Sequence, residues 1–121
     1  MNDWADQATI RERQKAACAV LARLLDLDLP APNWELSSIY STSRQHGELK
    51  GLLSDAYHGT DADRQASLDA WAAHFGVTPE PNSSGKFVYV RATVDGVNVT
   101  VWAGMDGPRK RQTRKQAAVT A

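Results

Sequence analysis

The chain has 121 residues, of which 42% are hydrophobic and 23% are charged, and its formal net charge is zero. This length and composition are typical of one globular domain with its own core, and they exclude a fibrous or wholly disordered chain. The single cysteine, Cys18, excludes an internal disulfide. The sequence has no apolar run of membrane-spanning length and no apolar signal-peptide core near its start, so we expect a cytoplasmic protein without a membrane anchor.

The zero net charge conceals an uneven distribution. Residues 1–107 carry a formal charge of −5 and residues 108–121 carry +5. The basic residues of this tail are Arg109, Lys110, Arg111, Arg114 and Lys115. A polar, basic segment with little to bury is typical of disorder. We therefore predict an N-terminal arm over 1–8, one domain over 9–107 and a disordered basic tail over 108–121.

The first helix is predicted over residues 5–27, where apolar residues return at three- and four-residue spacing. These residues are Ile10, Ala17, Val20, Leu21, Leu24 and Leu25. Thr9 and Glu12 match a capping box, which places the start of the regular helix at residue 9. Cys18 lies in the middle of this helix and is expected to be buried as a small apolar residue.

A first hairpin is predicted from a strand over 34–42 and a strand over 48–53. A two-residue turn at His46-Gly47 would place Trp34, Leu36, Tyr40, Leu49 and Leu53 on one face. Ile39 and Leu52 would then lie on the other face. A longer loop would change the pairing, so the register of this hairpin stays open at the sequence level.

The second helix is predicted from Asp61 to Phe75, with Thr60 or Asp61 as its cap and Gly76 as its end. Its apolar stripe consists of Leu68, Trp71, Ala72 and Phe75. On this pattern Arg64, Gln65 and Asp69 face away from the core. Residues 79–85 are rich in Pro, Ser and Gly and are predicted to be a loop.

The strongest signal lies in residues 86–103, where two alternating, β-branched runs flank Asp95-Gly96. This pair is typical of a two-residue type I′ hairpin turn, which sets the register. The core face then holds Val88, Val90, Ala92, Val94, Val97, Val99, Val101 and Ala103. The opposite face holds Phe87, Tyr89, Arg91, Thr93, Asn98, Thr100 and Trp102, with Tyr89 opposite Trp102.

The fold predicted from these elements is α+β, in the order αββαββ. It has one four-stranded antiparallel sheet with both helices packed on one face. Pro30-Ala31-Pro32-Asn33 returns as Pro79-Glu80-Pro81-Asn82 at an offset of 49 residues. One interpretation is an internal duplication with a pseudo-two-fold axis, and the other is coincidence between two proline-rich loops.

Three segments carry a resemblance. LARLLDLDLPAPNWEL, LDAWAAHFG and GVNVTVWA resemble segments of small uncharacterised proteins from actinomycete genomes and their mobile elements. The similarity covers most of residues 17–103 and leaves out the basic tail. Its motifs are apolar scaffold positions, so the resemblance implies a shared fold and assigns no catalytic residues.

Candidates for catalysis are few. His58 lies near Asp55, Asp61 and Asp63, but this spacing matches no zinc, calcium or H-x-x-x-H pattern, and helix-start and turn roles explain these residues. No nucleophile elbow, P-loop or dinucleotide-binding motif is present. We therefore expect no enzyme activity, no cofactor and no metal site; a small hydrolase or metal enzyme that uses His58 and these aspartates is the least favoured alternative.

The exposed sheet face is the better functional candidate. Aromatic side chains beside Arg on a sheet can stack nucleic-acid bases, and here Phe87, Tyr89, Arg91 and Trp102 would do so. The five cations of the tail could contact phosphates. The sequence thus predicts a small regulatory or accessory protein that binds nucleic acid. The alternative is a protein-binding or homodimerisation module whose aromatic face docks a partner.

Overall fold

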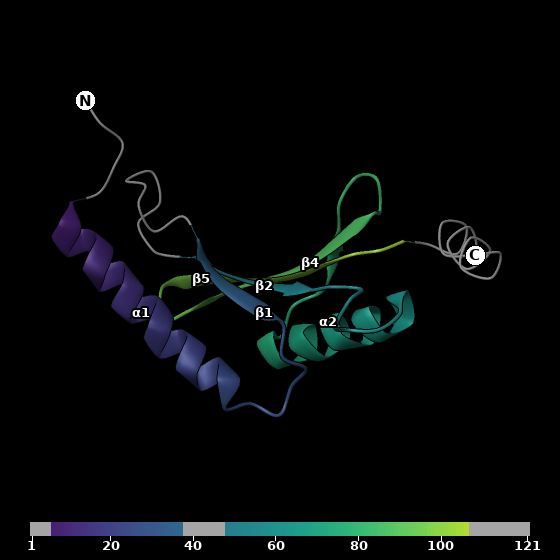
Figure 1. Cartoon of the computed structure of the whole chain (residues 1–121), viewed down its shortest axis with the longest axis horizontal. Helices are drawn as coiled ribbons and strands as arrows, with labels where there is room; N and C mark the ends of the chain where they lie inside the picture. Colours follow the sequence, from purple (N-terminus) through teal and green to yellow (C-terminus); the bar gives the residue numbers. More distant parts are fainter. Residues whose placement is uncertain (1–5, 38–47, 107–121) are drawn as a thin grey trace.

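The computed structural model describes residues 6–37 and 48–106, and these form an α+β fold (Figure 1). In chain order the elements are α1 (Gln7–Leu25), β1 (Asn33–Ser37), β2 (Glu48–Leu53), α2 (Asp61–Phe75), β3 (Glu80–Pro81), β4 (Phe87–Val94) and β5 (Val97–Gly104). The strands form one sheet in the order β1-β2-β5-β4-β3. Both helices lie on the same face of this sheet (Figure 1).

The predicted fold class is confirmed in outline, but the sheet differs from the prediction. It has five strands, and the central pair, β2 and β5, is parallel, whereas the other pairs are antiparallel. The predicted loop over 79–85 contains the short edge strand β3, in which Glu80 pairs with Tyr89 and Pro81 with Val88. The four-stranded, wholly antiparallel arrangement is therefore wrong.

The extra strand explains the parallel pair. β2 leads into α2 at one end of the sheet, and α2 runs away from that end (Figure 1). The segment after Gly76 then returns along the sheet as β3, so that β4 starts at the end where β2 finished. Because β4 runs opposite to β2, its hairpin partner β5 must run parallel to β2.

The parallel pair also excludes the pseudo-two-fold axis. An axis perpendicular to the sheet would make the adjacent equivalent strands β2 and β5 antiparallel. An axis along the strands would place α1 and α2 on opposite faces. Neither operation produces a parallel pair with both helices on one face, so the pseudo-two-fold interpretation is wrong.

The hairpin of β4 and β5 has the predicted register throughout. Val94 pairs with Val97 and Tyr89 pairs with Trp102. Asp95 and Gly96 have φ angles of 50° and 81°, as a type I′ turn requires. Along β4 and β5, alternate residues therefore reach the helix-covered face, where Val90, Val99 and Val101 are fully buried, and their neighbours reach the other face.

The loop that joins the two strands of the first hairpin is longer than two residues. Leu36 pairs with Leu49 and Ser37 pairs with Glu48, so the paired strands are joined by residues 38–47, which lie outside the described residues. The predicted His46-Gly47 turn is therefore wrong as a register-setting loop. Ile39, Tyr40 and the predicted strand residues up to 42 lie outside the described part of the chain.

Helix α1 begins at Gln7, between the two predicted starts at residues 5 and 9. Asp6 is its cap and accepts a hydrogen bond from the backbone N–H of Thr9 at 2.7 Å, so the boundary predicted at residue 9 lies inside the helix. This bond holds the pKa of the Asp6 carboxyl below its usual range. Ile10, Ala17, Val20 and Leu24 are buried.

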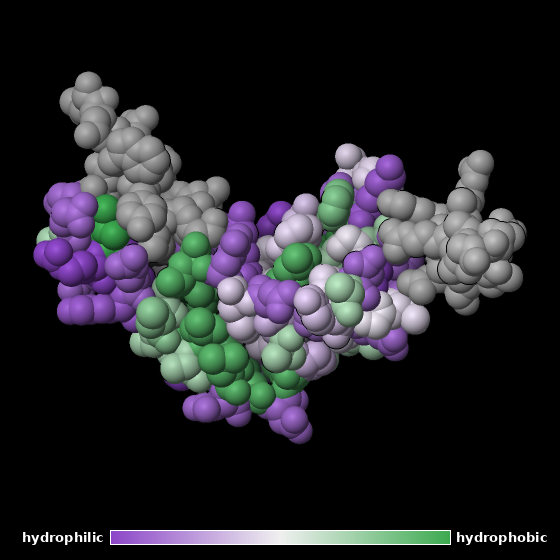
Figure 2. Space-filling view, in the orientation of Figure 1, coloured by the Kyte–Doolittle hydropathy of each residue, from purple (hydrophilic) through white to green (hydrophobic). Residues whose placement is uncertain are grey.

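Two predicted core positions of α1 are wrong. Leu25 is 58% exposed, and Cys18 is also exposed. The buried stripe of α1 turns away from both residues because only one side of the helix contacts the sheet. Figure 2 shows hydrophobic surface between α1 and the sheet on the viewed side. Neither helix of the described residues is long and apolar enough to cross a membrane.

Helix α2 has the predicted bounds, with Thr60 and Asp63 forming a capping box and Gly76 in the left-handed conformation. Leu68, Trp71 and Ala72 are buried, as predicted, and Phe75 packs against the core.

The outward orientation predicted for Arg64 is wrong, because its side chain is only 1% exposed. Its guanidinium donates to the Gly104 carbonyl at 3.2 Å, to the Gly59 carbonyl at 2.5 Å and to the Asp61 carboxylate at 2.5 Å. Asp61 also accepts from the backbone N–H of Asp106 at 3.0 Å. Arg64 thus joins the start of α2 to the end of β5.

We expect Arg64→Met to reduce the free energy of unfolding by about 3–5 kcal/mol, because it leaves the Asp61 carboxylate and two carbonyls without their buried donor. Urea unfolding measures the loss. The control is Arg23→Met, which removes a surface ion pair to Asp95 whose side chains are more than half exposed. That variant should lose less than about 1 kcal/mol. Equal losses in the two variants would contradict the structural role of Arg64.

Candidate functional site

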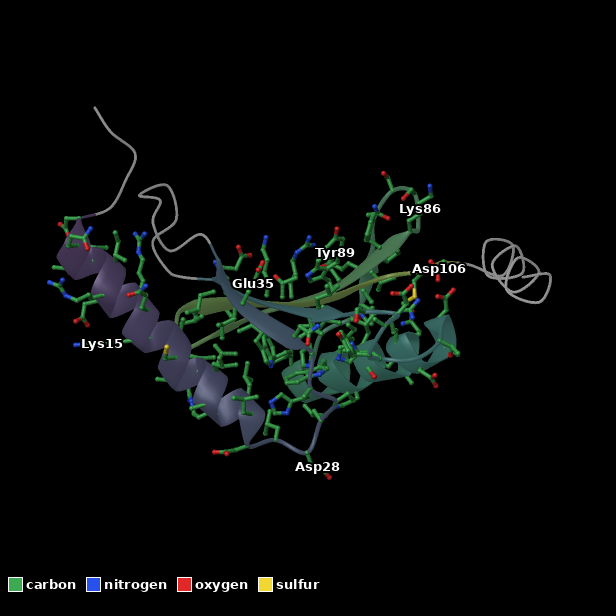
Figure 3. The ribbon with its side chains drawn as sticks, viewed as in Figure 1. Lys15, Asp28, Glu35, Lys86, Tyr89 and Asp106 are labelled. Atoms are coloured by element: carbon green, nitrogen blue, oxygen red, sulfur yellow. The ribbon has the colours of Figure 1, made fainter. Side chains whose placement is uncertain are left out.

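The face of the sheet opposite to the helices is the candidate site. No helix or strand of the described residues 6–37 and 48–106 lies over it, and Figure 3 shows Glu35 and Tyr89 on this side of the sheet. We call this surface the outer face. Its side chains come from all five strands and include Asn33, Glu35, Glu48, Lys50, Leu52, Glu80, Phe87, Tyr89, Arg91, Thr93, Asn98, Thr100 and Trp102.

The strand registers arrange these residues in three rows across the sheet. The aromatic row runs Leu52, Trp102, Tyr89. The charged row runs Glu35, Lys50, Thr100, Arg91. The polar row runs Glu48, Asn98, Thr93. The outer face therefore changes from aromatic to polar along the strand direction.

The aromatic row is packed together. The rings of Tyr89 and Trp102 are stacked, with centroids 6.2 Å apart and planes at 21°, and the ring of Phe87 lies 6.0 Å from that of Trp102. Trp102 and Tyr89 are half-buried, whereas Phe87 is 38% exposed. These rings form a preorganised apolar surface, because their conformations are already restricted by one another.

Arg91 is already engaged within the chain. Its guanidinium carbon lies 4.5 Å from the centre of the Tyr89 ring, and one guanidinium nitrogen lies 3.5 Å from a carboxylate oxygen of Glu80 on β3. The Tyr89 ring is thus stacked with Trp102 on its β5 side, and the Arg91 guanidinium lies over the same ring while it pairs with Glu80 on β3. A nucleic-acid base has little of the Tyr89 ring left to stack on.

A shallow groove of about 690 Å³ follows the charged and polar rows. Its charged lining consists of two acidic and two basic residues, Glu35, Glu48, Lys50 and Arg91. Glu80 adds a further carboxylate beside Arg91. The outer face therefore has no excess of positive charge, and its field alone would not attract a phosphate backbone.

The structure brings together four of the predicted binding residues, namely Phe87, Tyr89, Arg91 and Trp102. The five basic residues of the tail lie outside the described residues. The sequence analysis placed Leu52 opposite the core side chains of its hairpin, as the structure does, but it missed Glu35, Glu48 and Lys50 as members of the same face. The alternation of polar and apolar residues over 48–53 could have shown that Glu48 and Lys50 share a side of this strand. Their position beside β5, however, depends on the parallel pairing.

His58 has a structural role. Its Nδ1 accepts the backbone N–H of Ser54 at 2.8 Å, and its Nε2 lies 2.9 Å from the carbonyl oxygen of Ala31. Both ring nitrogens are thereby used to hold the β2–α2 connection against the segment that precedes β1. Within the described residues, no three His, Cys, Asp or Glu side chains are grouped so that they could hold a metal ion.

Comparison of the chain with protein-family models, with curated proteins and with solved structures finds no match. The class that the structure defines is an α+β protein with two helices on one face of a mixed five-stranded sheet. The resemblance to small actinomycete proteins stays a prediction.

His58→Ala removes both side-chain hydrogen bonds of the β2–α2 connection. We expect the free energy of unfolding to fall by about 1–2 kcal/mol, since each bond contributes roughly 1 kcal/mol. The matched control is Tyr57→Ala in the same connection, because the Tyr57 side chain is 81% exposed. Urea unfolding of both variants is the measurement. A His58→Ala variant as stable as Tyr57→Ala would contradict the structural role.

Proposed function

We propose that this protein is a non-enzymatic protein-binding module and that its outer face docks on a protein surface. The observation that carries the proposal is the set of packed rings of Trp102, Tyr89 and Phe87 beside a groove that is lined by equal numbers of acidic and basic side chains. Aromatic anchors that are already ordered lose little conformational entropy on binding, and aromatic residues and Arg are enriched at protein interfaces.

The charge of the outer face supports a protein partner over a nucleic acid. The charged row carries Glu35 at one end and Lys50 and Arg91 further along, so a matching surface needs groups of both signs. Protein surfaces offer both signs, whereas a phosphate backbone offers one.

A photo-crosslinking group placed on the outer face tests the proposal. Phe87 is replaced by benzoyl-phenylalanine, a change that keeps an aromatic side chain at an exposed position of this face. The matched control places the same group at Tyr57, which is aromatic and exposed but lies in the β2–α2 connection. We expect irradiation in the expressing cells to link a protein to position 87 and not to position 57. Equal or absent linkage at both positions would contradict the proposal.

A second candidate function is binding of nucleic acid, and the observation that favours it is the run of five cations over residues 109–115. Cations of this kind bind phosphates by charge, without sequence preference. The body of the chain, over residues 1–107, has a formal charge of −5 and would oppose this binding.

Titration of a labelled single-stranded oligonucleotide at two salt concentrations tests the second candidate. We expect deletion of residues 109–115 to weaken binding for every sequence and to reduce the salt dependence. Tyr89→Ala and Trp102→Ala should each reduce the affinity by about 1–3 kcal/mol at both salt concentrations if the rings stack bases. The absence of binding at low salt would contradict this function.

A further inference from the structure

The outer face is complementary to itself. We infer that its partner is a second copy of this chain, packed face to face about a two-fold axis that runs parallel to the strands between β2 and β5. The inference rests on the proposed function and names the partner of the same face. Its basis is the order of charges and aromatic residues across the sheet.

The charged row supplies the first argument. It places Glu35 on β1 at one end, Lys50 and Thr100 in the middle, and Arg91 on β4 at the other end. A two-fold axis between β2 and β5 superposes β1 of one copy on β4 of the other. Glu35 of each copy then faces Arg91 of the other, which makes two symmetric ion pairs, and Lys50 faces the uncharged Thr100.

The other rows agree with the same axis. In the aromatic row, Leu52 of one copy faces Trp102 of the other, and Tyr89 faces the uncharged Asn33. In the polar row, Glu48 is buried within its own chain and Asn98 is hydrogen-bonded to Thr93, so this row adds no charged contact to the dimer. No position of the three rows places two like charges opposite each other.

A two-fold axis perpendicular to the strands gives the opposite result. If it passes through the charged row, it superposes Glu35 on Glu35, Lys50 on Lys50 and Arg91 on Arg91. It also places the aromatic row over the polar row. Like charges and uncovered aromatic rings both disfavour this arrangement, so the charge order selects the axis parallel to the strands.

The geometry of sheets permits this contact. Two sheets pack face to face about 10 Å apart with strands aligned within about 30°. The axis between β2 and β5 overlaps four strands of each copy and leaves β3 uncovered. Four strands spaced about 4.8 Å apart and about 20 Å long cover roughly 400 Å² per copy, or about 800 Å² in total. An interface of this size is typical of weak, transient association, so we expect a reversible dimer that forms only at high micromolar concentration.

Arg91 can make the new contact while it keeps its present ones. Its ion pair with Glu80 is 3.5 Å long, and both side chains are more than half exposed. A guanidinium has five N–H donors, so it can bind a second carboxylate from above the sheet.

A charge-exchange experiment tests the inference with the full chain. Sedimentation at low salt, over about 1–300 µM protein, measures the dimer dissociation constant. We expect Glu35→Arg and Arg91→Glu each to weaken dimerisation at least 10-fold, because each places like charges opposite each other twice. An equimolar mixture of the two variants should dimerise again, since both contacts of the mixed dimer have opposite charges. The double variant E35R/R91E should also dimerise.

The control is Glu12→Arg on α1, whose side chain is 75% exposed and lies on the helix side of the molecule. It should dimerise like the unchanged chain, and circular dichroism shows that each variant is folded. Three results would overturn the inference: a monomeric chain at 300 µM, dimerisation that neither charge change weakens, or folded variants whose mixture stays monomeric. In each of these three cases, the proposed function still holds if the crosslinking group at position 87 links to a different protein.

Discussion

The register of the β4–β5 hairpin is the constraint on which the remaining structure depends. The turn at Asp95 and Gly96 needs positive φ at both residues, and it pairs every residue of β4 with a defined partner on β5. Because side chains alternate, a slip of one residue would move Val99 and Val101 from the core to the outer face. The same slip would take Trp102 and Tyr89 under the helices. This one turn therefore determines both which residues of the hairpin form the core and which lie on the outer face.

Hydrogen bonds from two side chains at the margins of the core help to hold the helices against the sheet. Trp71 packs against Trp34 and Phe75, and its indole N–H donates to the carbonyl of Pro30 at 2.8 Å. Arg64 performs the same task at the other end of α2, where three acceptors surround its guanidinium. A buried guanidinium is stable only when its donors are satisfied. These contacts fix the helix position and leave the outer face available for binding.

The proposed function and the proposed dimer depend on different properties of the outer face. The packed aromatic row indicates an interface of some kind, because ordered aromatic side chains at a surface are typical of binding sites. The order of charges along the neighbouring row indicates which partner fits. Glu35 and Arg91 lie at opposite ends of this row, on strands that are far apart in the sequence. Their complementarity is a property of the whole sheet and of no single strand.

Local patterns in the sequence determined the elements that depend on neighbours along the chain. These include the bounds of α2 with its cap at Thr60, the strand β2 and the complete register of β4 and β5. Each follows from capping, alternation or turn chemistry within a few residues. The four aromatic and basic residues predicted on the outer face of this hairpin follow from the same register.

Only the tertiary structure decided how these elements meet. The parallel pairing of β2 with β5 depends on the return of the chain as β3. The sequence did not predict this return, because a two-residue edge strand has no pattern of its own. That pairing brings Glu48, Lys50 and Leu52 to the outer face. The burial of Arg64 and the exposure of Cys18 also depend on which side of each helix the sheet covers. Helical spacing shows that residues share a side, but packing determines which side is buried.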